Sequence, residues 1–443
     1  MENSRKICAD IVEQVLTKNS YSNIVLRNEL NKHKLNDKDK GLITEIVYGT
    51  IKYKYTIDVI LNSFLKNGIK KLDSYVLNIL RTAVYQIKFL DKVPNFAAVN
   101  EAVELAKKKK SIGASKLVNG VLRNYLRNLN KIYYNQDNIV EALCFNYSFD
   151  KWLVNLFINQ YGIDTAEKIL KGLNEKPAVT VRVNNLKCSY DEAYNRLNEA
   201  GYDIEEGYVC PEAIVINKGK SVEFNPLFIE GLITVQDESA MLVAPSMELE
   251  DDFQVLDLCS APGGKTTHIS EIMGNTGIVK AFDIHSNKLS LVKANAKRLG
   301  INNLVCEKMD ASIFDEKLKA SADCVLIDVP CSGLGIIRKK PEIKYTKDLK
   351  ALKEIIDVQR KIMNNAAKYV KPKGSLLYST CTLNKKENED NIKWFLKNNP
   401  QYTIEPLYYG KLDNFIYSQE GCTTILPNKY MDGFFITKLR RQW

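Results

Sequence analysis

The stretch Leu256-Asp257-Leu258-Cys259-Ser260-Ala261-Pro262-Gly263-Gly264-Lys265-Thr266 decides the fold of the larger part of this chain. An apolar run, residues 253–258, leads into a glycine-rich turn, and a helical pattern follows. A turn of this kind between a strand and a helix points backbone N–H groups at a bound ligand. The stretch therefore predicts an α/β domain with a ligand above this strand.

Strand-like and helical runs alternate from about residue 250 to the end of the chain. The predicted strands are residues 253–258, 277–283, 304–308, 324–328 and 375–379, and amphipathic helical stretches such as 288–299 and 349–370 separate them. This order predicts a doubly wound, mostly parallel sheet. Residues 423–426 and 433–439 are expected to add an antiparallel hairpin.

Three interpretations of the glycine-rich turn compete. A phosphate-binding loop, G-x-x-x-x-G-K-[ST], matches at Gly264, Lys265 and Thr266, but Cys259 stands where the first glycine belongs. The strand ending in Asp328 would then carry a magnesium-binding acid, so an NTPase is a serious rival. A dinucleotide fingerprint, G-x-G-x-x-G, is absent.

The third interpretation is a nucleoside cofactor without a phosphate chain, S-adenosylmethionine. Asp283 ends the second predicted strand 19 residues after Gly264, and a ribose-binding acid is expected about 20 residues on. Asp310, after the third strand, would accept from the adenine amino group. A single acid at such a place is more often a turn residue or a helix cap, but with Asp328 three acids follow successive strands.

Two of the ten cysteines lie in polar loops that follow predicted strands. Cys331 is in Asp328-Val329-Pro330-Cys331-Ser332-Gly333, and Cys381 is in Tyr378-Ser379-Thr380-Cys381-Thr382. An unpaired cysteine is usually a small buried hydrophobe, and Cys306 and Cys324 fit that default. Because ligands bind beyond the carboxyl ends of parallel strands, we expect Cys331 and Cys381 to face one crevice.

Paired thiols suit one kind of methyl transfer. Carbon 5 of a pyrimidine is a poor nucleophile, so its methylation requires that a thiolate first add to carbon 6. A second base must then remove the carbon 5 proton before the first thiol can leave. Two cysteines and one acid fit these steps, and the target base must be single-stranded or flipped out of its helix.

Positive charge is concentrated in the first third of the chain. Residues 1–140 carry 24 lysines and arginines against 13 acids, whereas residues 141–443 carry 39 against 40, within a net charge of +10. This region reads as all helical, and Arg123, Arg127 and Lys131 would form a basic stripe on one helix. The apolar face of that helix would be formed by Leu117, Val118, Val121, Leu122, Leu126 and Leu129. The asymmetry points to a polyanionic partner.

The region from about 140 to 245 is more acidic and reads as a small βαβ-type module. A predicted strand, 178–183, precedes a capping box at Ser189 and Glu192, a helix that ends at Gly201, and a second strand, 213–216.

Cysteine and histidine usage and hydropathy limit the class of protein. The scattered cysteines form no C-x-x-C pair, and the three histidines do not pair with cysteines at zinc-ligand spacing. No export or membrane signal is visible. We expect a cytoplasmic monomer with free thiols and no metal.

These residues resemble the Sun family of RNA cytosine-5 methyltransferases, also called Fmu or RsmB, which modify small-subunit ribosomal RNA. The resemblance covers nearly the whole chain. It is strongest in Cys259 to Thr266 of the turn quoted first, around both cysteine loops, and in Asp432-Gly433-Phe434-Phe435. Thr180-Val181-Arg182-Val183-Asn184 also matches. Segments such as Val47-Tyr48-Gly49 and Val118-Asn119-Gly120-Val121-Leu122-Arg123 are similar to the RNA-binding NusB fold.

The resemblance implies a role for each candidate residue. Cys381 would be the nucleophile at carbon 6, Cys331 would assist release of the product, and Asp328 would hydrogen-bond the cytosine ring edge. S-adenosylmethionine would be held by Cys259, Ser260, Ala261, Pro262, Gly263, Gly264, Lys265, Asp283, Asp310 and Asp328.

We therefore expect a ribosomal RNA (cytosine-5)-methyltransferase that uses S-adenosylmethionine and acts on small-subunit (16S) RNA. Its domains would be a NusB-like helical RNA-binding domain (1–138), a small α+β linker domain (139–245) and a Rossmann-like methyltransferase domain (246–443). Two alternatives stay open: an RNA-binding assembly protein with a silent catalytic domain, and a P-loop-like NTPase that depends on Lys265.

Overall fold

The computed structural model describes residues 4–18 and 20–443, and the chain divides into two compact units. The helical unit runs up to Asn174 and also includes Ile337–Lys347. The sheet unit consists of Glu175–Ile336 and Asp348–Trp443. The chain thus leaves the sheet unit after Ile336 and returns to it at Asp348.

The helical unit is built from helices, as the sequence predicts for the first third of the chain. Several begin at N-cap side chains that accept a backbone N–H, for example Asp73 from Val76 and Ser111 from Ala114. The helices are α1 (Ser4–Lys18), α2 (Ser22–Lys32), α3 (Asp37–Lys52), α4 (Lys54–Asn62), α5 (Ser74–Phe89), α6 (Asn95–Lys109), α7 (Ile112–Leu126), α8 (Ile139–Tyr147), α9 (Lys151–Tyr161), α10 (Ile163–Gly172) and α16 (Ile343–Thr346), with a short 3₁₀ turn, Ile69–Lys71.

Helices α3 and α5 touch at a glycine. A Cβ atom added to Gly49 would overlap the ring of Tyr85, whose hydroxyl donates to Glu45 Oε1 at 2.6 Å. Gly49 therefore permits a close approach that a larger residue would block.

The predicted basic stripe is wrong beyond α7. The helix ends at Leu126, and Lys131 lies past it, with its Nζ 5.7 Å from the centre of the Tyr133 ring. Beyond the helix, the N–H of Asn128 donates to the backbone oxygen of Tyr125 at 2.9 Å, and its side-chain amide donates to that of Asn124 at 2.8 Å. Of the predicted apolar face, Val118, Val121 and Leu122 are buried and Leu126 is partly buried, whereas Leu117 and Leu129 are 39% and 42% exposed.

The segment Ile337–Lys347 supplies buried polar groups to the helical unit. The Glu342 carboxylate accepts from the Ser22 hydroxyl at 2.7 Å. The Lys344 ammonium donates to the backbone oxygens of Lys52 and Ser148 at 3.1 and 3.0 Å and to Asn174 Oδ1 at 2.9 Å. Burial lowers the pKa of Lys344 well below its usual value.

The small sheet of the sheet unit has the order β2-β3-β1-β4, and its strand pairs are antiparallel. Its strands are β1 (Val179–Val183), β2 (Asp203–Glu206), β3 (Ala213–Lys218) and β4 (Ile233–Val235), and α11 (Tyr190–Glu199) links β1 to β2. The Ser189 hydroxyl caps α11 by accepting from the N–H of Glu192 at 3.2 Å, as predicted. The second predicted strand, β3, pairs antiparallel with β1 and so does not complete a simple βαβ unit. Strands β2 and β4 were not predicted, and β3 lies between β1 and β2.

The large sheet has the order β11-β12-β13-β9-β8-β5-β6-β7, and β10 pairs with β13. The five predicted strands form its parallel part, and the predicted hairpin pairs β12 with β13. Two short strands, β10 and β11, were not predicted. The bounds are β5 (Gln254–Asp257), β6 (Ile278–Asp283), β7 (Leu304–Lys308), β8 (Ala322–Asp328), β9 (Val370–Thr380), β10 (Tyr402–Glu405), β11 (Phe415–Tyr417), β12 (Thr423–Ile425) and β13 (Phe434–Arg441).

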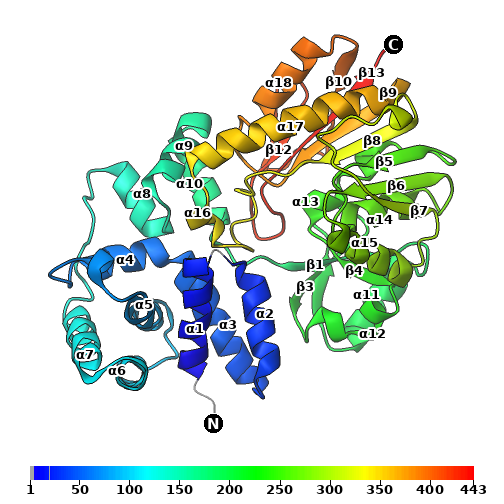
Figure 1. Ribbon diagram of the computed structural model, residues 1–443. Helices are drawn as coiled ribbons and strands as arrows, with labels where there is room; N and C mark the ends of the chain where they lie inside the picture. Colours follow the sequence, from blue (N-terminus) through cyan, green and yellow to red (C-terminus); the bar gives the residue numbers. More distant parts are fainter. Residues whose placement is uncertain (1–3, 19) are drawn as a thin grey trace. The chain divides into compact units, whose positions relative to one another are not determined.

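Helices cover both faces of this sheet (Figure 1). On β8, Val325 and Ile327 pack into the same core as Ile362 of α17 (Leu349–Tyr369), whereas Leu326 packs into a second core with Ile269 of α14 (Gly264–Ile272). Helix α18 (Glu389–Asn398) lies on the α17 side, and α15 (Ser286–Leu299) lies beside α14. This alternation is the doubly wound arrangement predicted from the sequence.

The two compact units do not follow the predicted boundaries at 138 and 245. Helices α8 to α10 belong to the helical unit, and the small and large sheets share the other. The three-domain division stays a prediction. In the described part of the chain, no helix has the length and apolar character that crossing a membrane requires.

Candidate active site

The predicted candidate residues gather at the carboxyl ends of the parallel strands. Strands β5 and β8 are neighbours, and β6 and β9 flank them, so the order reverses around β5. Asp328, the last residue of β8, lies opposite Ser379 of β9. This is the topological switch point at which open α/β sheets bind ligands.

Cys331 and Cys381 lie side by side in the loops after β8 and β9. Their sulfur atoms are 3.3 Å apart, and both side chains are partly buried. The hydrogen bond to Cys381, together with burial, raises the pKa of Cys331 well above its ordinary value.

Asp328 is held from two sides. Lys265 Nζ donates to Asp328 Oδ2 at 2.7 Å, and the Ser379 hydroxyl donates to Asp328 Oδ1 at 2.9 Å. Burial alone would lower the pKa of Lys265, but the Asp328 carboxylate outweighs it and the pKa is raised. The sequence interpretation included Lys265 in the cofactor turn and missed this ion pair, although β5 and β8 are adjacent.

The glycine-rich turn is fixed to its own strand by an acid that the sequence interpretation did not select. Asp257 accepts from the Thr266 hydroxyl at 2.6 Å and from the N–H of Cys259 at 3.3 Å. Burial raises the pKa of Asp257 to about 7. Its position at the end of an apolar strand, directly before the turn, was the signal that could have identified it.

The rest of the turn approaches the sheet closely. The N–H of Ser260 donates to the backbone oxygen of Phe282 at 2.8 Å. Gly263 has a φ of 103°, and a Cβ there would lie 3.1 Å from Val292. A glycine suits this position because it combines a left-handed backbone with a close contact.

Asp283 is the last residue of β6 and Asp310 follows β7; these are the next strands along the same edge. Asp283 Oδ1 accepts from the N–H of His285 at 2.8 Å, and Asp310 Oδ1 accepts from the N–H of Ser312 at 2.9 Å. Both acids therefore also serve as turn residues. Each is partly exposed and makes its hydrogen bond through Oδ1, so Oδ2 can accept from a ligand hydroxyl or amine.

These residues fit a nucleoside cofactor. The turn brings backbone N–H groups to the start of α14, and two partly exposed carboxylates follow along the edge of the sheet. The described residues contain no group of His, Cys, Asp and Glu that could hold a metal ion.

A buried carboxylate, Glu387, fixes the two cysteine loops to each other. It accepts from the N–H of Ser332 at 2.9 Å and from the side-chain amides of Gln359 and Asn384 at 3.0 Å each. The Ser332 hydroxyl also lies 2.7 Å from that of Thr382. Sequence reasoning missed Glu387, since it lies in a charged run that resembles a solvated surface.

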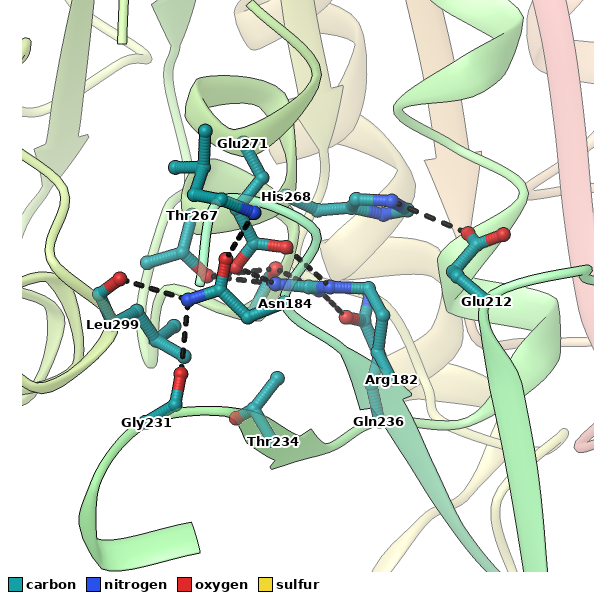
Figure 2. Close-up of polar contacts among 12 residues, drawn as sticks. Arg182, Asn184, Glu212, Gly231, Thr234, Gln236, Thr267, His268, Glu271 and Leu299 are labelled. Atoms are coloured by element: carbon teal, nitrogen blue, oxygen red, sulfur yellow. Dashed lines mark hydrogen bonds and ion pairs between the residues drawn. The ribbon is translucent and has the colours of Figure 1, made fainter. Parts of the chain in front are cut away.

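A second buried network joins the small sheet to the turn (Figure 2). Arg182 of β1 donates to both carboxylate oxygens of Glu271 on α14, at 2.7 and 3.0 Å, and to the backbone oxygen of Gly264 at 3.1 Å. Gln236, which follows β4, also accepts from Arg182. The guanidinium is fully buried, so the small sheet helps to fix the start of α14.

Comparison with known proteins defines the class of this fold and site. The 16S rRNA methyltransferase RsmB/F family model matches residues 244–440. The NusB family model matches residues 2–127, and the model of the RsmF/B-like ferredoxin-like domain matches residues 149–223. The parallel part of the large sheet, with its turn and two thiols, is thus a Rossmann-like methyltransferase domain.

Full-length relatives define the family. The probable ribosomal RNA small subunit methyltransferase B of Bacillus subtilis is 36% identical over 99% of this chain and 98% of its own. The ribosomal RNA small subunit methyltransferase B of Shewanella oneidensis is 31% identical over 99% of each chain. The chain belongs to the ribosomal RNA small subunit methyltransferase B family.

Solved structures agree with this assignment. The crystal structure of PH0851 is 28% identical and matches with a TM-score of 0.84 over 100% of this chain and 99% of its own. NSun6 from Pyrococcus horikoshii with SFG is 25% identical and matches with a TM-score of 0.59 over 67% of this chain and 99% of its own.

Proposed function

We propose that this protein transfers a methyl group from S-adenosylmethionine to carbon 5 of a cytosine in small-subunit ribosomal RNA, through a covalent bond between Cys381 and the base. The observation that carries this proposal is the pair of thiols 3.3 Å apart beside Asp328. Methyl transfer to an amine or a hydroxyl needs no thiol nucleophile. Carbon 5 of cytosine needs one thiolate to activate the ring and one base to release it.

The cofactor would be held by the turn from Cys259 to Lys265 and by the acids at the carboxyl ends of β6 and β7. Asp283 would accept from the ribose hydroxyls, and Asp310 would accept from the adenine amino group. The relative that was crystallised with SFG, an analogue of S-adenosylmethionine, supports this choice. When bound, the cofactor supplies an electrophilic methyl group.

The chain's own groups would act in sequence on the base. The Cys381 sulfur forms a bond to carbon 6, and the electron pair displaced from the ring makes carbon 5 nucleophilic. Asp328, held by Lys265 and Ser379, accepts from the cytosine amino group and orients the ring. After carbon 5 has gained the methyl group, Cys331 acts as a thiolate that has released its own proton to solvent. It takes the carbon 5 proton, the double bond re-forms, and the bond to Cys381 breaks to return the Cys381 thiolate. A raised pKa makes the Cys331 thiolate a stronger base.

A trapped adduct tests these roles. The Cys331→Ala variant and the Cys331→Ala/Cys381→Ala variant are each incubated with S-adenosylmethionine and protein-free small-subunit ribosomal RNA and run on a denaturing gel. A covalent protein–RNA band is expected with the single variant and not with the double. Cys306→Ala/Cys331→Ala is the matched control, since Cys306 lies on β7, and it should retain the band. No band in any variant, while the wild type transfers methyl groups, would overturn the roles.

The two alternative functions predict different results. An NTPase is not favoured, because the chain belongs to a methyltransferase family and the Lys265 ammonium pairs with Asp328. An RNA-binding assembly protein with a silent catalytic domain would bind ribosomal RNA but transfer no methyl group, either to free RNA or to ribosomal particles.

A further inference from the structure

A groove of about 780 Å³ lies on the sheet unit, apart from the site described above. It is lined by the start of β1, the ends of β3 and β4, the turn that follows β3, and Lys429. Its apolar surface includes Val179 and Val235, which are 44% and 51% exposed. This volume is in the range of pockets that hold one small ligand. The groove is therefore large enough for a few nucleotides of a single nucleic-acid strand and too small for a double helix.

The lining of this groove is strongly basic. Four lysines face it against a single acid, Glu223; the lysines are Lys176, Lys218, Lys220 and Lys429. The Lys429 ammonium forms an ion pair with Glu205 at 2.9 Å. Within the described residues, the other three lysines form no ion pair, and all three are exposed. Three uncompensated ammonium groups around one hollow favour a polyanion.

We propose that this groove binds the sugar–phosphate backbone of the substrate RNA a few nucleotides away from the target base. The proposal rests on the proposed function, because it takes ribosomal RNA as the polyanion. The lysines would contact phosphates, and the exposed valines would contact a sugar or the face of an unpaired base.

The groove is connected to the thiols by a short path. Lys429 precedes Gly433 by four residues, which span at most ~14 Å. The N–H of Gly433 donates to the Gly335 oxygen at 3.0 Å, and the N–H of Gly335 donates to the Cys381 oxygen at 2.9 Å. With ~5 Å for each hydrogen-bonded step, the groove lies within roughly 25 Å of Cys381. A stacked strand of about seven nucleotides, at ~3.4 Å each, covers that distance.

Charge removal in the full-length protein tests the groove. The first variant is Lys176→Gln/Lys218→Gln/Lys220→Gln, and the matched control is Lys317→Gln/Lys373→Gln/Lys397→Gln, three exposed lysines of the same unit. The dissociation constant for protein-free small-subunit ribosomal RNA is measured over a range of salt concentrations. The groove variant should bind roughly tenfold more weakly or worse, and the slope of log K against log salt should fall by about 2, at ~0.7 for each lost phosphate contact.

Methyl transfer measured on the same samples separates this proposal from the proposed function. If the groove variant binds RNA like the control while the wild type transfers methyl groups, the groove proposal is overturned and the function stands. If the groove variant binds more weakly but the wild type transfers no methyl group, the proposed function fails and the groove stands. For an active wild type, the groove variant is expected to show a raised KM for RNA, and the control an unchanged one.

Discussion

Asp257 combines a structural task with a titration near neutral pH. Asp257 is 1% exposed, and its carboxyl group ties the glycine-rich turn to the end of β5. Burial raises its pKa from 3.8 to about 7. Between about pH 4 and 7 the folded protein therefore holds a proton that the unfolded chain has released. The free energy of unfolding should therefore fall as the pH rises from about 4 to 7. Above pH 7, Asp257 is ionised in both states and should cause no further change.

The Asp257→Asn variant isolates this contribution. Asparagine has the shape of a protonated aspartate but does not titrate, so the variant should gain stability relative to the wild type as pH rises. The gain should be at most about 1.4 kcal/mol per pH unit between pH 4 and 7. Urea denaturation at pH 5.0 and 7.5 measures it. Asp283→Asn, on the next strand and partly exposed, is the control; the same pH dependence in both variants would contradict the prediction.

For single residues, the sequence predicted which side chains lie close together but not the hydrogen bonds and ion pairs that fix them. The pattern of strands and polar loops predicted that Cys331 and Cys381 face one crevice, and their sulfur atoms are 3.3 Å apart. The Lys265–Asp328 ion pair depends on the direction of a long side chain across two strands, which no local pattern encodes. The catalytic and cofactor-binding roles stay predictions.

The contact between α3 and α5 gives a prediction about stability. Gly49→Ala places a methyl group where the Tyr85 ring lies, so it should lower the free energy of unfolding by about 1–3 kcal/mol, the range for overpacking. Gly120→Ala is the matched control, because it lies on α7 with open space around its Cβ. That variant should gain up to about 1 kcal/mol from helix propensity. Chemical denaturation compares them, and equal effects would show that the contact is unimportant.

The buried ion pair between Arg182 of β1 and Glu271 of α14 gives a second prediction about stability. Arg182→Met should cost about 3–5 kcal/mol of stability, because it leaves the Glu271 carboxylate buried without its partner. Arg182→Met/Glu271→Leu should recover much of that loss, since both charges are gone. Arg196→Met is the control: Arg196 pairs with Glu230 at 3.2 Å at the surface, and its loss should cost no more than about 1 kcal/mol. Denaturation midpoints measure the stability of the three variants. If Arg182→Met and Arg182→Met/Glu271→Leu were equally stable, the loss would not come from an unpaired Glu271 carboxylate.

Elements with a strong period were predictable, and short ones were not. Strands β5 to β9 have apolar runs, and each was predicted. Strand β11, Phe415–Tyr417, has only three residues, one of them buried, and it exists through its pairing with β12. The end of α7 at Leu126 has no glycine or proline to mark it in the sequence. The small sheet was predicted only in part: strands β1 and β3 and helix α11 were indicated, whereas the short strands β2 and β4 were not, and their order is set by pairing between distant residues.

The uneven charge of the whole chain predicts where salt acts on RNA binding. Charge reversal at Arg123, Arg127 and Lys131, all exposed in the helical unit, should weaken binding to small-subunit ribosomal RNA and flatten its salt dependence. The same reversal at Lys317, Lys373 and Lys397 is the control. Filter binding at several salt concentrations distinguishes them. Unchanged affinity and slope in the first variant would mean that the basic N-terminal third is not an RNA-binding surface.

The division into units could be predicted only in part. The charge boundary near residue 140 marks a change in character, yet the helical unit extends to Asn174 and takes in Ile337–Lys347. Local patterns cannot show that a chain returns to a distant unit, because the contacts of Glu342 and Lys344 are with residues far away in the sequence.

The segment Ile337–Lys347, which returns to the helical unit, is synthesised long after the helices that it contacts. Ribosomes add about 5–20 residues per second, so on the order of 10–35 s pass between the synthesis of Asn174 and that of Lys347. Throughout that interval the backbone oxygens of Lys52 and Ser148 lack the Lys344 ammonium that donates to them in the finished protein. The Ser22 hydroxyl likewise lacks its acceptor, the Glu342 carboxylate. The helices that leave the ribosome first are therefore the first to be made and among the last to be completed.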